Sequence, residues 1–205
     1  MGPATFGSIK LVVKNIFEIE NLIHHINTFI PVSSELKNRL KSICKIETFP
    51  KGHFLHKPES TCLNTYFINK GLVRIYYLKD DKEITDNFAA ENEWITSIYS
   101  FLKNIPDHFH IQTLETTELA GISLNDLEEC FKDYPEMERF GRMLISAYFL
   151  EQSERIISLQ FNSARERYQF FERTSKNKLQ RVLPLGMLAS HLGMTQETLS
   201  RVRAS

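Results

Sequence analysis

The residues best suited to chemistry lie between Thr195 and Arg203. Amide, carboxylate, hydroxyl and guanidinium groups follow one another there at a helical spacing. These groups are the ones that hydrogen-bond to base edges in the major groove of DNA. The candidate DNA-contacting residues of this stretch are Thr195, Gln196, Glu197, Ser200, Arg201 and Arg203.

The residues just before this stretch predict a helix that packs against it. Leu188, Ala189 and Leu192 share one helical face, and Gly193 supplies the left-handed residue that ends a helix. Thr195 can then cap a second helix through its hydroxyl. Two helices joined by a tight glycine-containing turn form a helix-turn-helix unit. An ordinary helical hairpin, with its second helix facing solvent, is the alternative interpretation.

Charge is distributed unevenly along a chain whose net charge is zero. From Ser163 onward there are eight Lys and Arg residues against three Asp and Glu, so this part carries about +5 and the preceding part about −5. A basic segment of this kind suits a nucleic-acid-binding module. We expect Lys178, Arg181 and Arg203 to contact DNA phosphates.

Composition limits the class of protein. The chain has 205 residues, and 42% of them are hydrophobic, which supports a substantial core. Cys44, Cys62 and Cys130 are scattered, which fits a reducing cytoplasm and predicts neither a C-x-x-C metal site nor an iron–sulfur cluster. No apolar run approaches the roughly 18 residues of a membrane span, and no signal peptide is recognisable. We expect a cytoplasmic protein that binds no membrane.

The middle of the chain has the alternating pattern of short strands. We expect strands at 46–49, 53–56, 65–68, 72–77, 83–89, 93–98, 108–114 and 118–123. The clearest hairpin joins the third and fourth of these through Asn69, Lys70 and Gly71. About eight short strands without intervening helices predict an antiparallel barrel or jelly roll.

Helical patterns flank the strands. Shorter helices are predicted at 16–29, 35–43, 124–131 and 164–173, whereas 174–181 is predicted as a loop. A long helix should begin at Pro135 and run to about Phe161. Its two apolar stripes predict that one face packs on the barrel and the other on a second copy of the chain. The fold class is therefore α+β. It comprises a jelly-roll sensor domain (16–134), a long dimerisation helix (135–161) and a helix-turn-helix domain (163–205).

This order of elements resembles the Crp/Fnr family of bacterial transcription regulators. The residues that carry the resemblance are Lys51–Leu55, Tyr66–Tyr77, Ala164–Tyr168, Leu188–Thr195 and Ser200–Arg203. The resemblance implies a jelly roll of the cyclic-nucleotide-binding type and a homodimer along the long helix. It also implies a signal that reorients the DNA-binding modules. Double-stranded DNA is then the main partner, and RNA polymerase is a candidate partner.

The recognition helix departs from the family pattern. Members commonly carry Arg-Glu followed by Arg four residues on, where this chain has Gln196, Glu197 and Arg201. Arg201 should bond guanine bidentately, Glu197 could accept from cytosine, and Gln196 prefers adenine. The sequence continues only two residues past Arg203, whereas many members add a β-hairpin wing. The missing phosphate contacts predict weaker and more salt-sensitive binding.

The sensor barrel also departs from the members that bind cyclic nucleotides. They hold the nucleotide with a Gly-Glu pair and an Arg-Ser or Arg-Thr pair, which align here with Thr96-Ser97 and Asp107-His108. An aspartate in the place of arginine would repel a phosphate. We expect no tight binding of cyclic AMP and an unidentified small-molecule effector or none. The candidate pocket residues are Thr96, Ser97, Asp107, His108 and Tyr148, although these could equally be ordinary barrel positions.

Two other functions stay open. His108, His110 and Glu115 resemble the metal motif of the cupins, which share the jelly-roll shape, and His53 and His56 could join them. The cupins also need a later histidine, which this chain has only at position 191. A degenerate family member with a structural role is the second alternative. No catalytic pattern is recognisable, so we expect neither an enzyme nor a bound metal.

Overall fold

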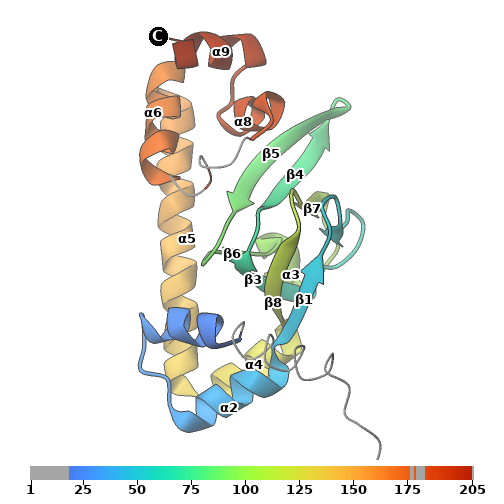
Figure 1. Cartoon of the computed structure of the whole chain (residues 1–205), viewed down its shortest axis with the longest axis vertical. Helices are drawn as coiled ribbons and strands as arrows, with labels where there is room; N and C mark the ends of the chain where they lie inside the picture. The colour runs from blue at the N-terminus through green and yellow to red at the C-terminus, as the bar shows by residue number, and fades with distance from the viewer. Residues whose placement is uncertain (1–18, 176–177, 179–182, 205) are drawn as a thin grey trace, which may run out of the picture.

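The computed structural model describes residues 19–175, 178 and 183–204. It contains a β jelly roll, a long helix beside it and a small helical module at one end of that helix (Figure 1). The predicted α+β class and the order of its parts are confirmed. Among the described residues, no helix combines the length and apolar character that a membrane crossing requires.

The jelly roll consists of two four-stranded antiparallel sheets. One has the order β1-β8-β3-β6 and the other β2-β7-β4-β5. The strands are β1 Lys45–Phe49, β2 Phe54–His56, β3 Asn64–Lys70, β4 Val73–Lys79, β5 Lys82–Ala89, β6 Trp94–Ile95, β7 Phe109–Thr113 and β8 Thr117–Ser123. Each predicted strand therefore has a counterpart.

Two local predictions were wrong. Strands β3 and β4 do not form a hairpin, because β3 pairs with β6 and β8 in one sheet and β4 with β5 and β7 in the other. Gly71, at a φ of 115°, makes this crossing, and a Cβ on it would lie 2.6 Å from the Thr117 hydroxyl oxygen. The strand predicted at 93–98 ends at Ile95, and a helix missed by the sequence analysis, α3 (Ile98–Lys103), follows.

Helices close the end of the jelly roll away from the helical module. They are the helical residues 19–27, α2 (Ser34–Ile43) and α4 (Leu124–Asp133), which pack with the start of the long helix around Phe67, Ala120 and Ile122. The hydroxyls of Ser33 and Ser123 cap α2 and α4. Residues 16–18 of the first predicted helix lie outside the described part.

The long helix α5 (Pro135–Phe161) has the predicted bounds and two different faces. Met137 and Phe140 are buried against the jelly roll and its flanking helices. Large apolar side chains on the other side remain exposed: Phe149, Leu150, Ile156, Ile157 and Phe161. The predicted division into a covered and an uncovered face is therefore present within one chain.

The terminal module consists of α6 (Ala164–Thr174), α8 (Leu185–His191) and α9 (Gln196–Ala204). Ser163 and Glu166 form a capping box at the start of α6. Gly193 has a φ of 61° between α8 and α9, as the turn requires. Leu188, Ala189, Leu192 and Leu199 form the core of the module.

Candidate nucleic-acid interface and sensor cavity

The polar face of α9 is open to solvent. Thr195, Gln196, Glu197, Ser200, Arg201 and Arg203 are all exposed, whereas Leu199 on the opposite side is fully buried. The helix lies at the extreme end of the molecule in Figure 1, beyond the jelly roll. This arrangement presents base-reading groups on one uncovered surface.

The start of α9 is held in place by its own residues. The Thr195 hydroxyl accepts a hydrogen bond from the Thr198 backbone N–H at 3.2 Å. A hydrogen bond from its own backbone N–H lowers the pKa of Glu197, and contacts with Thr195 and Arg201 lower it further. Glu197 is therefore a carboxylate at neutral pH, which can accept from a base amino group.

Two further phosphate-contacting residues, Lys178 and Arg181, were predicted N-terminal to α8. Lys178 is buried, and its ammonium nitrogen lies 3.0 Å from a carboxylate oxygen of Glu93 beside β6. The expected exposure of Lys178 to DNA phosphates is wrong for this conformation, because the ion pair turns the side chain toward the jelly roll. Arg181 lies outside the described residues.

The helical module is docked on the jelly roll through α8. The Ser190 hydroxyl accepts from the Thr85 backbone N–H at 3.2 Å, and His191 Nδ1 donates to the Asp86 carbonyl oxygen at 2.9 Å. Leu72, Phe88 and Ala90 of the jelly roll join the apolar core of the module. The position of α9 therefore depends on strand β5.

An ionic contact from the long helix supports this docking. Arg155 of α5 lies 3.7 Å from an Asp86 carboxylate oxygen and donates to the His191 carbonyl oxygen at 3.4 Å. Burial, together with the positive charge of Arg155, lowers the pKa of His191 to about 3. The docked contact therefore requires a neutral imidazole at position 191.

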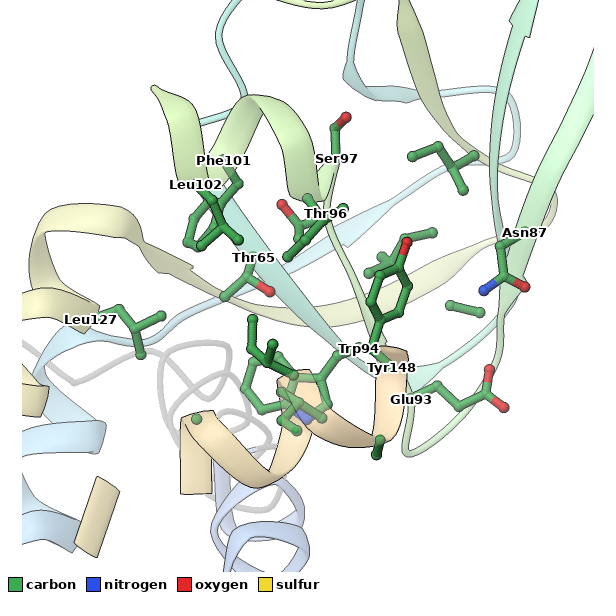
Figure 2. Close-up of a pocket in the computed structure, with 18 of the residues that line it drawn as sticks. Thr65, Asn87, Glu93, Trp94, Thr96, Ser97, Phe101, Leu102, Leu127 and Tyr148 are labelled. Carbon is green, nitrogen blue, oxygen red and sulfur yellow. The ribbon is translucent and has the colours of Figure 1, made fainter. Parts of the chain in front are cut away.

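A cavity of about 540 Å³ lies between the jelly roll and α5. Its size is in the range typical of small-molecule sites, about 300–1,000 Å³. The apolar part of its wall includes Phe29, Trp94, Phe101, Leu102, Leu127 and Phe140. Figure 2 shows Leu127, Phe101 and Leu102 toward one end, and Asn87, Glu93 and Tyr148 toward the other.

The polar end of the cavity borders the docked module. Asp86, Glu93, Glu151 and Lys178 all line it. The Glu93–Lys178 pair, which joins the module to the jelly roll, therefore faces the cavity, as does Asp86, which pairs with Arg155 of α5. Burial raises the pKa of the Asp86 and Glu151 carboxyl groups, and the neighbouring Glu93 raises that of Glu151 further. Burial also raises the pKa of Tyr148 to about 12, so its hydroxyl remains protonated.

Three of the five predicted pocket residues line the cavity, namely Thr96, Ser97 and Tyr148. Asp107 does not line it, because its carboxylate accepts from Ser97 and Phe109 and pairs with His56 at 2.9 Å. These hydrogen bonds lower the pKa of Asp107 in spite of the opposing effect of burial. The effector-pocket assignment of Asp107 is therefore wrong.

His108 is also absent from the cavity wall. It is exposed, and its ring is stacked on Phe109. The sequence analysis missed Asp86, Glu93 and Glu151, whose side chains line the polar end. Glu151 lies three residues after Tyr148 on the same face of α5, so helical spacing could have found it, whereas no local pattern marks Asp86 or Glu93.

The histidines of the alternative metal motif are separated. His110 stacks on Tyr76 with ring centroids 4.6 Å apart, and His108 is exposed. In the described part of the chain, no group of three or more His, Cys, Asp or Glu side chains is placed to hold a metal ion. The structure therefore does not bring His108, His110 and Glu115 together as the cupin interpretation requires.

Comparisons with known proteins agree with this architecture. Residues 46–134 match the family model of the cyclic nucleotide-binding domain. FixK2 from Bradyrhizobium japonicum has a TM-score of 0.69 at 15% identity, over 79% of this chain and 83% of that one. CLP from Xanthomonas campestris, described as a c-di-GMP responsive global regulator, has a TM-score of 0.64 at 20% identity, over 84% of this chain and 90% of that one. No curated protein sequence matches the chain.

A third solved structure carries the family's name. It comes from Eubacterium rectale, and its description assigns it to the transcriptional regulators of the Crp/Fnr family. Its TM-score is 0.64 at 18% identity, over 83% of this chain and 81% of that one. The chain thus has a jelly roll that matches the model of the cyclic nucleotide-binding domain over residues 46–134, and together with its long helix and helix-turn-helix module it shares the fold of these Crp/Fnr-type regulators.

Proposed function

We propose that the chain is a sequence-specific, DNA-binding transcription regulator rather than an enzyme. The observation that carries the proposal is the exposed polar face of α9, held in a helix-turn-helix whose core of Leu188, Ala189, Leu192 and Leu199 is buried. Arg201 and Glu197 set base choice, and Gln196, Ser200 and Thr195 complete the contacts. Arg203 binds a phosphate, as does Arg181.

The regulator acts as a homodimer through α5. Phe149, Leu150, Ile156, Ile157 and Phe161 leave an apolar stripe on the side of the helix away from the jelly roll. A stripe of this kind on a long helix favours burial against a second copy. The dimer places two α9 helices for two half-sites of an operator. RNA polymerase as a partner and a cytoplasmic location remain predictions.

The 540 Å³ cavity is the sensor site, and cyclic AMP is not its ligand. Its described wall contains the carboxyl groups of Asp86, Glu93, Glu128 and Glu151 but no arginine, and its one lysine, Lys178, is already paired with Glu93. A buried phosphate needs a cationic partner, and nearby carboxylates repel it. Isothermal titration should detect no binding at micromolar cyclic AMP, whereas a micromolar or tighter affinity would refute this assignment.

Selection from a random-sequence DNA pool by the purified protein tests the central proposal. We expect an enriched motif with two related halves, since a symmetric dimer reads symmetric half-sites. Failure to enrich any sequence would instead favour the structural role that the sequence left open.

A further inference from the structure

The cavity and the docking contact of the helical module share residues. Asp86 and Glu93 line the cavity, and the same two residues bind Arg155 and the module's Lys178. Lys178 itself lines the cavity wall. A ligand at this end therefore touches the contact that fixes the module on the jelly roll, with no intervening element.

The charge of the wall indicates the kind of ligand. The described lining includes four carboxyl groups, of Asp86, Glu93, Glu128 and Glu151, and one lysine, Lys178. Arg155 approaches Asp86, and Glu93 takes Lys178, whereas Glu151 forms no ion pair with another described residue. A cation added between Glu93 and Glu151 relieves their repulsion, but an anion there adds to it.

The remainder of the cavity indicates the body of the ligand. Rings and branched chains form most of the wall, and the labelled apolar residues Leu127, Phe101 and Leu102 lie away from Glu93 and Asn87 (Figure 2). A wall of this composition takes up apolar surface, and its few polar groups fix the orientation. The ligand is therefore amphipathic, with its polar group toward β5 and α5.

We propose that the cavity binds an apolar amine, whose ammonium group competes with Lys178 for Glu93 and so loosens the docked helix-turn-helix module. This inference rests on the proposed regulator function and identifies the class of its effector. Loss of the Lys178–Glu93 pair removes one of the polar contacts between module and jelly roll. The remaining hydrogen bonds of Ser190 and His191 then hold α8 less firmly.

Trp94 provides a direct readout of ligand binding. It is the only tryptophan of the chain, and it lines the cavity. Decylamine, decanoate and decan-1-ol share a chain length and differ in head-group charge at pH 7. Titrated into the full chain below micellar concentrations, decylamine should change Trp94 fluorescence with a Kd at least tenfold below that of decanoate. Decanoate binding as tightly as decylamine, or no binding by any probe, overturns the proposal.

A matched pair of variants locates the ammonium group. In the unaltered chain, a Glu93 carboxylate oxygen accepts a hydrogen bond from the Ala90 backbone N–H at 2.9 Å. Glu93→Gln keeps the side-chain size and an oxygen that can accept this hydrogen bond. This variant should weaken the binding of decylamine about tenfold and leave the affinity for decan-1-ol unchanged. Glu128→Gln removes a lining carboxylate next to Leu127 and should leave both affinities unchanged. An equal effect of the two variants contradicts the assignment; if Glu93→Gln does not fold, the comparison of probe charges on the unaltered chain still decides it.

Hydrogen exchange tests the loosening without DNA. Saturating decylamine should increase exchange of backbone amides in α8 (Leu185–His191) at least tenfold, whereas decan-1-ol should not. Binding without this increase contradicts the coupling. Because neither measurement involves DNA, failure of the proposed DNA-binding function would be seen separately, in the DNA selection.

Discussion

His191 of the helix-turn-helix module donates a hydrogen bond from Nδ1 to the Asp86 carbonyl oxygen of β5, at 2.9 Å. The contact joins residues 105 positions apart and ties the orientation of α9 to the jelly roll. Arg155 of the long helix contacts both residues. The three parts of the molecule therefore meet at one point.

Acid should release the module from β5. The pKa of His191 falls from 6.5 to about 3 in the docked state, so the undocked state binds more protons below pH 6.5. The stability of docking is complete above about pH 6.5 and declines as the pH falls toward 3. Amide protection in α8, corrected for intrinsic exchange rates, should therefore be lower at pH 5 than at pH 7.

The control for this pH dependence is His191→Asn, which retains a donor and does not titrate. Burial raises the pKa of Asp86, so protonation of Asp86 favours the docked state as the pH falls and opposes the effect of His191. The variant should lose the acid-induced decrease in protection. Identical pH profiles for the variant and the unaltered chain would show that His191 is not responsible.

Arg201→Ala should weaken specific DNA binding by about 1–3 kcal/mol and relax the base preference at one position. The reason is that a guanidinium reads guanine bidentately, while alanine offers no donor. Fluorescence anisotropy with the selected sequence and with random DNA measures both effects. Arg139→Ala, an exposed arginine of α5 far from α9, is the matched control and should change neither affinity.

Replacing Phe149 and Ile156 with glutamate should dissociate the dimer. Both side chains are more than half exposed in the single chain, and charges facing each other across a helix pair oppose association. Light scattering after size exclusion should give the single-chain mass of 23.9 kDa. Leu78→Glu, at an exposed apolar site in β4, should leave the dimer intact; a dimer that survives the double substitution would place the interface elsewhere.

Gly71→Ala should destabilise the jelly roll by about 2–4 kcal/mol, because it combines an unfavourable φ with a steric clash. A Cβ there would lie 2.8 Å from the Thr117 Cα, which is backbone and cannot swing away. Gly52→Ala also has a positive φ but meets no atom within 4 Å, so about 1–2 kcal/mol is expected. Urea unfolding measures the loss of stability in each variant. Equal losses in the two variants would mean that the steric clash with Thr117 contributes nothing.

Local patterns in the sequence were sufficient for most of the elements. Pro135 and the polar residues after Phe161 mark the ends of α5, and serine caps mark α2, α4 and α6. The Asn69–Gly71 turn led to the wrong prediction of a hairpin, because the residue types that form a hairpin turn also occur where a chain crosses between two sheets. Pairing is a long-range property, and only the fold shows that β3 lies beside β8.

The candidate site was also predictable only where local sequence patterns determine it. The exposed face of α9 follows from helical period alone, so its residues could be identified without the fold. The polar end of the cavity could not, since Asp86, Glu93 and Lys178 come from three separate segments. Lys178 looked like a free cation in a basic segment, and only its position beside Glu93 shows that it is paired.

The most direct test of the account is selection of DNA by the purified chain, repeated with Arg201→Ala. We expect a motif with two related half-sites whose centres lie about 10 base pairs apart, or a multiple of that, and the loss of one base preference per half-site in the variant. No enriched motif, or the same motif at the same affinity with Arg201→Ala, would contradict the claim that α9 reads DNA.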